Sequence, residues 1–163
     1  MTTAAAVNEG DPAPDFELAT DGGGHFRLSD KRGAPVVLYF YPKDDTSGCT
    51  KEAIGFTELK PKFDEMQTLI IGISPDDADE HDKFKKKYGL GITLGADTDQ
   101  QVAKAYGVWV EKSMYGRKYM GVERATYLID RDGVVAKVWR NVKVPGHMDE
   151  VLDTVRLVAG TTG

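Results

Sequence analysis

The chain has 163 residues, a formal net charge of −5 and a single cysteine. This length fits one domain with a substantial hydrophobic core, and the acidic balance argues against a nucleic-acid partner, which favours a basic face. One cysteine cannot form an internal disulfide, so the composition is typical of a reducing cytoplasm rather than of a secreted disulfide scaffold.

The sequence contains no segment suited to a membrane or to secretion. Its longest uncharged apolar runs, around residues 34–42 and 66–75, fall short of the roughly 18 residues that a membrane span needs. The first ten residues lack a basic start and a long apolar stretch, so we expect no signal peptide. We therefore expect one cytoplasmic domain over residues 1–163, with residues 1–10 and 160–163 flexible.

The first half of the chain predicts a hairpin followed by a βαβ unit. Residues 16–20 and 25–28 alternate apolar and polar side chains around a glycine-rich turn, which predicts an N-terminal β-hairpin. Residues 36–41 and 68–73 are continuous apolar runs, typical of strands that are buried on both faces. Between them, residues 49–60 carry apolar side chains at helical spacing, and such a unit crosses over right-handed.

The next helix carries clear sequence signals at both ends. We expect it over residues 78–88, with Ser74 as N-cap, Pro75 at the first position and Asp77 as the capping-box partner. Gly89 ends it.

The remaining elements complete an alternation of strands and helices. They are a short strand at 92–94, a helix at 100–106, a hairpin of 124–129 with 134–139, and an amphipathic helix at 147–158. The sequence therefore predicts an α/β fold in which helices cover both faces of one sheet.

The only cysteine, Cys49, is expected where a buried strand gives way to a helix. The first turn of a helix has unpaired amide groups and the positive end of the helix dipole, and both stabilise a thiolate, which is the reactive form of cysteine. None of His25, His81 and His147 falls in a Cys–His protease motif, and no Cys-x-x-Cys is present. The sequence thus predicts a reactive thiol that needs neither metal nor cofactor.

Three segments together resemble the peroxiredoxins, in particular their bacterioferritin-comigratory-protein or Q-type branch. They are the P-x-x-x-T-x-x-C motif of Pro42, Thr46 and Cys49, residues 114–121, and Arg124-Ala-Thr-Tyr-Leu-Ile-Asp130. The resemblance covers about residues 11–157. It implies a thioredoxin-like fold with a central mixed sheet, and a thiol-dependent peroxidase that reduces hydrogen peroxide and organic hydroperoxides through a cysteine sulfenic acid.

The resemblance also implies a role for each site residue. Cys49 would be the nucleophile, Thr46 and Arg124 would polarise the peroxide and stabilise the thiolate, and Pro42 would shape the pocket. The backbone amides of Gly48 and Cys49 would bind the substrate. Such a site must stabilise a thiolate first and an oxygen leaving group later, which aligned amides and a guanidinium can do.

The sequence departs from the branch at Ile54, where many members carry a second, resolving cysteine. The sulfenic acid on Cys49 must then be reduced by an external thiol, such as thioredoxin, glutaredoxin or a small thiol. The branch resemblance favours a monomer. The alternative to a peroxidase is a redox-sensing protein that forms mixed disulfides with partners through Cys49. A structural domain with an inert cysteine is a third and more distant alternative.

Other polar and aromatic groups receive structural interpretations. We expect His81 to be a structural histidine at the edge of the core, and Asp44 and Asp45 to be loop charges rather than a metal site. Trp109, Met114 and Tyr115 are interpreted as packing or rim residues that could touch a partner. The lysines at positions 83–87 are interpreted as a solvated helix end.

Overall fold

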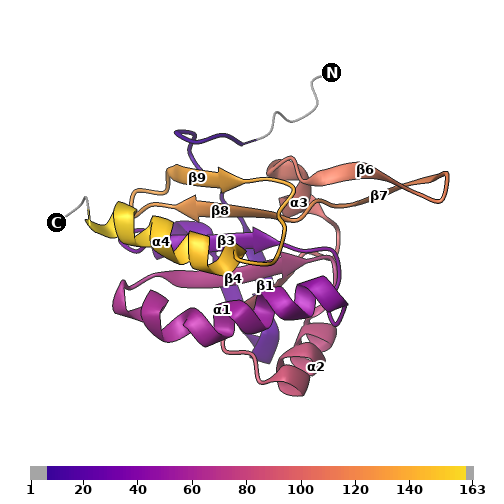
Figure 1. The fold of residues 1–163 in the computed structure, drawn as a ribbon, viewed down its shortest axis with the longest axis horizontal. Helices are drawn as coiled ribbons and strands as arrows, with labels where there is room; N and C mark the ends of the chain where they lie inside the picture. Colours follow the sequence, from indigo (N-terminus) through magenta and orange to yellow (C-terminus); the bar gives the residue numbers. More distant parts are fainter. Residues whose placement is uncertain (1–6, 161–163) are drawn as a thin grey trace.

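The fold is described by a computed structural model over residues 7–160 (Figure 1). The expectation of flexible ends falls largely on residues 1–6 and 161–163, which lie outside the described residues. Val7 is buried, and the amide of Gly10 donates to the carbonyl of Val135 at 2.8 Å, so the chain joins the body of the fold from its first described residues.

One mixed sheet forms the centre of the fold, with its strands in the order β2-β1-β5-β4-β3-β8-β9. The parallel strands β3, β4 and β5 lie in the middle, and antiparallel strands flank them on both sides. The predicted N-terminal hairpin is present as β1 and β2, and it joins the sheet along β5. The strands are β1 (Glu17–Thr20), β2 (His25–Arg27), β3 (Val36–Phe40), β4 (Leu69–Ser74), β5 (Thr93–Ala96), β8 (Ala125–Ile129) and β9 (Val135–Trp139).

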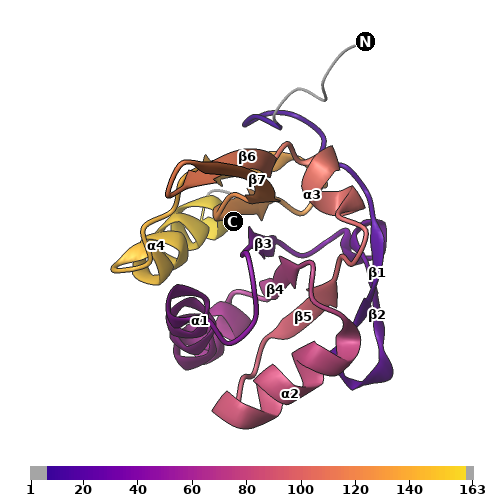
Figure 2. The same ribbon diagram turned by 90° about the vertical axis from the view of Figure 1, so that its right-hand side faces the viewer.

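Helices cover both faces of the sheet, which confirms the α/β prediction. They are α1 (Ser47–Glu65), α2 (Ala78–Tyr88), α3 (Gln101–Ala105) and α4 (His147–Gly160). Along β3, Val37 and Tyr39 pack with α1, α2 and α4, whereas Leu38 and Phe40 pack in a second core with α3, because successive strand residues point to opposite faces. Figure 2 shows α1 and α2 on one side of the central strands and α3 on the other. No helix within residues 7–160 is long and apolar enough to cross a membrane.

Helix α1 extends beyond its predicted end. It continues past Pro61 to Glu65, whereas the spacing of apolar residues predicted an end near residue 60. Phe63 lies after the proline and is completely buried. Its burial offsets the backbone hydrogen bond that proline cannot make.

Helix α2 has the predicted bounds but not the predicted cap. Asp77, not Ser74, is the N-cap, and its side chain accepts a hydrogen bond from the amide of Glu80 at 2.8 Å. Ser74 instead ends β4, where it pairs with Ala96 of β5. Sheet pairing therefore keeps Ser74 extended, and the helix starts later.

A hairpin that the sequence analysis did not predict projects from the body (Figure 1). Its strands are β6 (Trp109–Met114) and β7 (Arg117–Val122), and we call residues 109–122 the arm. Tyr115 and Gly116 form its turn, with φ angles of 52° and 79°. Charged and apolar residues mix on both faces of the arm, so it lacks the clean alternation by which a half-buried strand is predicted.

Candidate active site

Cys49 lies in the first turn of α1, just beyond the carboxyl end of β3. It is 1% exposed. The first bond within this helix runs from the amide of Thr50 to the carbonyl of Thr46, so the amides of Ser47, Gly48 and Cys49 form its positive end. The sulfur therefore lies where the sequence placed it, at a strand-to-helix junction.

Arg124 lies directly against the sulfur. It precedes β8, whose Ala125 pairs with Phe40 at the end of β3, so the sheet brings Arg124 beside the loop that leads to Cys49. Its Nη2 donates to Sγ of Cys49 at 3.3 Å, and its Nη1 donates to Oε1 of Glu52 at 2.7 Å. Burial opposes the charge of Arg124, but the neighbouring Glu52 and Cys49 outweigh it and raise the pKa of the guanidinium.

Glu52 is a member of the site that the sequence analysis missed. It lies three residues after Cys49 on α1, is fully buried, and has an Oε2 without a hydrogen-bond partner among residues 7–160. Burial raises the pKa of Glu52 to about 7, and Arg124 opposes that shift. Helical i, i+3 spacing was the available signal, since it places both side chains on one face.

Tyr39 borders the same buried region from β3. Burial raises the pKa of its phenol, and the charges of Glu52 and Cys49 add to this effect. Its hydroxyl also has no hydrogen-bond partner among the described residues. The wall of the site thus combines an aromatic ring stacked on Phe56, with ring centroids 4.9 Å apart, and an unpaired hydroxyl.

Gly48 allows the guanidinium to lie close to the helix start. A Cβ at this position would lie 3.0 Å from Nη2 of Arg124 and 3.7 Å from its Cζ. The structure therefore brings Gly48, Cys49 and Arg124 together, as the sequence analysis expected for a substrate site. The absent side chain is what leaves room for the cation.

Thr46 and Pro42 lie on the loop between β3 and α1. The hydroxyl of Thr46 donates to the carbonyl of Lys43 at 2.9 Å and makes no capping bond to the helix. Pro42 is half-buried and follows the last paired residues of β3. The Thr46 hydroxyl thus stabilises the conformation of this loop. Its oxygen still has lone pairs that can accept a hydrogen bond from a ligand.

A buried ion pair anchors this loop to α2. Nδ1 of His81 lies 2.7 Å from Oδ2 of Asp44, and its Nε2 lies 2.9 Å from the carbonyl of Gly95. The hydroxyl of Tyr41 donates to Oδ1 of Asp44 at 2.6 Å. Two acceptors around one imidazole favour the doubly protonated ring, and Asp44 raises the pKa of His81 even though burial opposes the charge.

This finding corrects two interpretations from the sequence. His81 is fully buried rather than at the edge of the core, and Asp44 is a buried partner rather than a plain loop charge. The two residues are far apart in the sequence and meet only because α2 packs against the Cys49 loop.

His147, the first residue of α4, makes its hydrogen bond to a threonine and not to the sulfur. Nε2 of His147 lies 2.8 Å from the hydroxyl of Thr126, and burial lowers the pKa of His147 to about 4. The ring is therefore neutral near pH 7. Within residues 7–160, the hydrogen bond to Sγ of Cys49 comes from Arg124 and not from a histidine.

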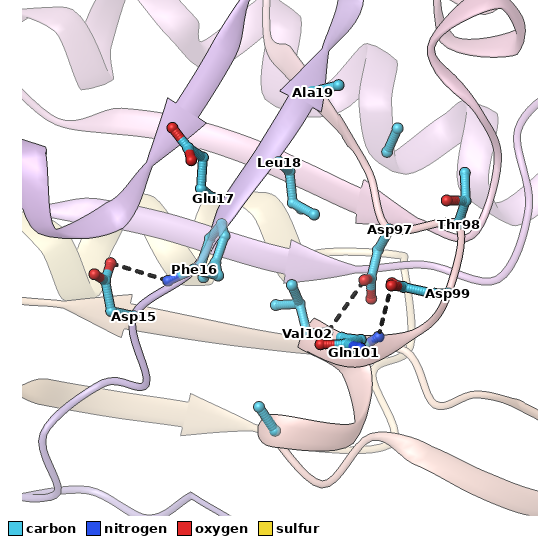
Figure 3. A pocket seen from close by; sticks show the side chains of 12 residues that line it. Asp15, Phe16, Glu17, Leu18, Ala19, Asp97, Thr98, Asp99, Gln101 and Val102 are labelled. Atoms are coloured by element: carbon cyan, nitrogen blue, oxygen red, sulfur yellow. Dashed lines mark hydrogen bonds between the residues drawn. The ribbon is translucent and has the colours of Figure 1, made fainter.

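A separate cavity of about 410 Å³ lies between β1 and α3 (Figure 3). Several carboxylates line it, and that of Asp97 accepts hydrogen bonds from the amides of Val102 and Ala103. The Asp97 carboxylate therefore caps the first amides of α3. None of the predicted site residues lines the cavity. Among residues 7–160, no group of three or more His, Cys, Asp or Glu side chains is arranged to hold a metal ion.

Comparisons with known proteins give a consistent result. Residues 9–138 match the model of the AhpC/TSA family. The chain is 47% identical to peroxiredoxin Bcp of Bacillus subtilis over 150 residues, which cover 92% of this chain and 96% of that protein. It resembles a structure of Xanthomonas campestris peroxiredoxin Q with a TM-score of 0.87 and 39% identity, covering 96% of this chain and 99% of that one.

A second structure from the same organism concerns alkyl peroxide reduction by the bacterioferritin comigratory protein. The similarity has a TM-score of 0.85 and 40% identity, and it covers 88% of this chain and 92% of that one. These chains thus share the fold over nearly their whole length.

Proposed function

This chain belongs to the AhpC/TSA family as a peroxiredoxin of the Bcp or Q-type branch, a thiol-dependent peroxidase, and we propose that Cys49 is its peroxide-reducing nucleophile. The resemblance noted from the sequence is thereby confirmed, as is the thioredoxin-like α/β fold. The observation that carries the assignment of Cys49 is the 3.3 Å hydrogen bond from Arg124 to its sulfur.

The proposed first step is attack of the Cys49 thiolate on one peroxide oxygen. A sulfur–oxygen bond forms, the oxygen–oxygen bond breaks, and the second oxygen leaves as hydroxide or alkoxide and takes up a proton. The guanidinium of Arg124 and the first amides of α1 stabilise the thiolate and then the departing oxygen. Thr46 orients the peroxide through its hydroxyl, and Pro42 limits access of water to the sulfur.

The second step is reduction of the sulfenic acid by an external thiol. Cys49 is the only cysteine of the chain, and Ile54, at the branch's resolving position, packs against the helix-side core. We propose thioredoxin, glutaredoxin or a small thiol as the reductant, a monomeric enzyme, and a cytoplasmic location where such thiols are kept reduced. The substrates are hydrogen peroxide and organic hydroperoxides, a class supported by the alkyl peroxide activity named for the X. campestris relative.

The direct test is peroxide consumption with dithiothreitol as reductant. We expect catalytic turnover by the wild type and none by Cys49→Ser, with unchanged circular dichroism. Mass spectrometry with a sulfenic-acid trap should find one modified residue, Cys49, after a single addition of peroxide. Ile54→Ser, on the same helix but away from the sulfur's hydrogen bond, is the matched control and should retain turnover. Peroxide consumption by Cys49→Ser at the wild-type rate would refute the assignment.

A further inference from the structure

The arm carries most of the large apolar side chains that are exposed in the described part of the chain. Within residues 7–160, the large apolar side chains that are exposed are Leu69, Met114, Tyr115, Tyr119, Met120 and Leu157, and four of these lie on the arm. Tyr115, at its tip, is 98% exposed. Clustered apolar residues on a surface of this kind mark sites of interaction.

One face of the arm combines two of these apolar groups, Met114 and Tyr119, with positive charge, whereas Met120 lies on the other face. Lys112 pairs with Tyr119 across the two strands, and Met114 pairs with Arg117. Because side chains two residues apart lie on the same side of a strand, these four share one side, which we call the cationic face. Methionine, tyrosine and arginine, which supply three of these four residues, are among the residue types enriched in protein interfaces.

The cationic face leads directly to the sulfur site. The amide of Glu123 donates to the carbonyl of Val108 at 2.8 Å and closes the base of the arm, and Arg124 follows at once. Lys112 is half-buried there; burial lowers its pKa, and the charge of Arg124 lowers it further, whereas Cys49 opposes the shift. In Figure 1 the arm projects from the same end of the molecule at which α1 begins.

The charge of the arm is opposite to that of the chain. The arm carries Lys112, Arg117 and Lys118 against Glu111, in a chain with a net charge of −5. An acidic partner would therefore be drawn to the arm and repelled by the rest of the surface.

Tyr115 is poorly suited to the backbone conformation of the turn in which it lies. Tyr115 and Gly116 both have positive φ, a two-residue turn that favours Asn or Gly at the first position. A bulky aromatic residue is strained there, and its almost complete exposure gives it little packing in return. Its presence suits a contact with another molecule better than it suits the stability of the hairpin.

We propose that the cationic face of the arm is the docking surface for an acidic dithiol protein that reduces oxidised Cys49. This proposal rests on the proposed peroxidase function and names the partner of that same site. The partner's thiolate attacks the sulfur of the Cys49 sulfenic acid; the sulfur–sulfur bond forms, and the oxygen leaves with a proton as water. The partner's second thiolate then attacks the mixed disulfide, which leaves the partner oxidised and Cys49 as a thiolate.

A second copy of this chain fits the face less well. A two-fold symmetric contact would place the same patch of both copies together. The positive charges of Lys112 and Arg117 from both copies would then gather in one contact, and like charges across an interface are unfavourable.

The test compares protein reductants with dithiothreitol, using an acidic thioredoxin and an acidic glutaredoxin. For Arg117→Glu we expect the KM for the protein reductant to rise about tenfold or more, because the charge at the docking face is reversed. Turnover with dithiothreitol and the rate of Cys49 oxidation by peroxide should stay at wild-type values. The wild-type KM should also rise with salt, and that of the variant should rise less.

The matched control is Lys118→Glu. Lys118 is next to Arg117, and replacing it by glutamate changes the charge by the same amount. Its side chain, however, lies on the opposite side of the arm. We expect its KM to stay within about twofold of the wild type. Tyr115→Asn supplies an independent variant: it should raise the melting temperature, since Asn suits the turn, and yet raise the KM for the protein reductant.

An unchanged KM in Arg117→Glu would overturn the docking proposal, as would equal effects of Arg117→Glu and Lys118→Glu. Turnover by the wild type with dithiothreitol but with neither protein would overturn it as well, while leaving the peroxidase intact. Failure of the wild type to consume peroxide with dithiothreitol would refute the peroxidase and the docking proposal together.

Discussion

The carboxylate of Glu52 and the guanidinium of Arg124 form a 2.7 Å ion pair inside the protein, and Glu52 is completely buried. The same guanidinium donates to the sulfur of Cys49. Arg124 therefore donates at once to the carboxylate of Glu52 and to the sulfur of Cys49. Because the pKa of Glu52 is raised to about 7, the charge of this carboxylate changes with pH in the neutral range.

Glu52→Gln should remove a pH dependence of stability. The pKa of Glu52 is raised from 4.5 to about 7 in the folded state, so the unfolded chain loses this proton first. Wild-type stability should then fall as the pH rises from about 4.5 to 7, by on the order of 3 kcal/mol relative to the variant. Urea unfolding at several pH values measures the difference.

Glu58→Gln is the matched control for this prediction, because Glu58 is an exposed glutamate on the same helix. The free energy of unfolding of Glu58→Gln should change with pH in the same way as that of the wild type. If the free energy of unfolding of Glu52→Gln also changed with pH as it does in the wild type, this would contradict the raised pKa of the buried carboxyl.

His81→Gln should destabilise the protein mainly at lower pH. The pKa of His81 is raised by Asp44, so its stabilisation is fully present below about pH 6.5 and is lost as the pH rises through the folded-state value. Removing one partner of a buried ion pair costs roughly 3–5 kcal/mol. Denaturant unfolding should show that the difference from the wild type shrinks as the pH increases.

The double variant Asp44→Asn/His81→Gln keeps this prediction testable if the single variant folds poorly. It should regain part of the lost stability, because no unpaired charge is left buried. A double variant no more stable than His81→Gln would show that the pair does not act through its charges.

Gly48→Ala should slow the reaction with peroxide without unfolding the protein. The new Cβ would lie 3.0 Å from Nη2 of Arg124 and displace the guanidinium from the sulfur. Loss of such a donor slows catalysis by up to about 10²–10³-fold. Stopped-flow measurement of peroxide reduction gives the rate, and circular dichroism reports the fold.

Gly91→Ala is the control glycine, since a Cβ there would meet side-chain carbons at 3.4 and 3.5 Å, which are close to ordinary contacts. It should react at the wild-type rate. Equal rates for Gly48→Ala and the wild type would mean that the position of Arg124 does not limit the reaction.

Ile54→Cys should form an internal disulfide only when α1 opens. Two residues five apart on an intact helix have Cα atoms roughly 8–9 Å apart, beyond the reach of a disulfide. After peroxide treatment, mass spectrometry should show a disulfide between Cys49 and the introduced cysteine, and circular dichroism should show a loss of helix. Ile54→Ser, treated in the same way, should keep its helix content; a disulfide with unchanged helix content would contradict this reasoning.

The sequence predicted those parts of the protein that depend on local patterns. The buried strands β3 and β4 were evident as continuous apolar runs, and Cys49 was expected at a helix start because the strand ends shortly before it. The resemblance added Arg124, which the structure places on the sulfur.

The remainder depends on contacts between distant residues. Glu52 gains its raised pKa from burial and its partner from a residue 72 positions away, and His81 meets Asp44 across 37 positions. The arm was missed for a different reason: with both faces largely exposed, its strands carry no apolar face to predict them.

The most direct test of the role of Cys49 is the rate at which peroxide oxidises it in the wild type and in Arg124→Met, followed by stopped flow at one neutral pH with Cys49→Ser as the blank. We expect rapid formation of the Cys49 sulfenic acid in the wild type and a rate lower by roughly 10²–10³-fold in Arg124→Met, because the variant lacks the guanidinium that donates to the sulfur. Equal rates in the two proteins, or no sulfenic acid on Cys49 of the wild type, would show that this hydrogen bond does not create the reactive sulfur.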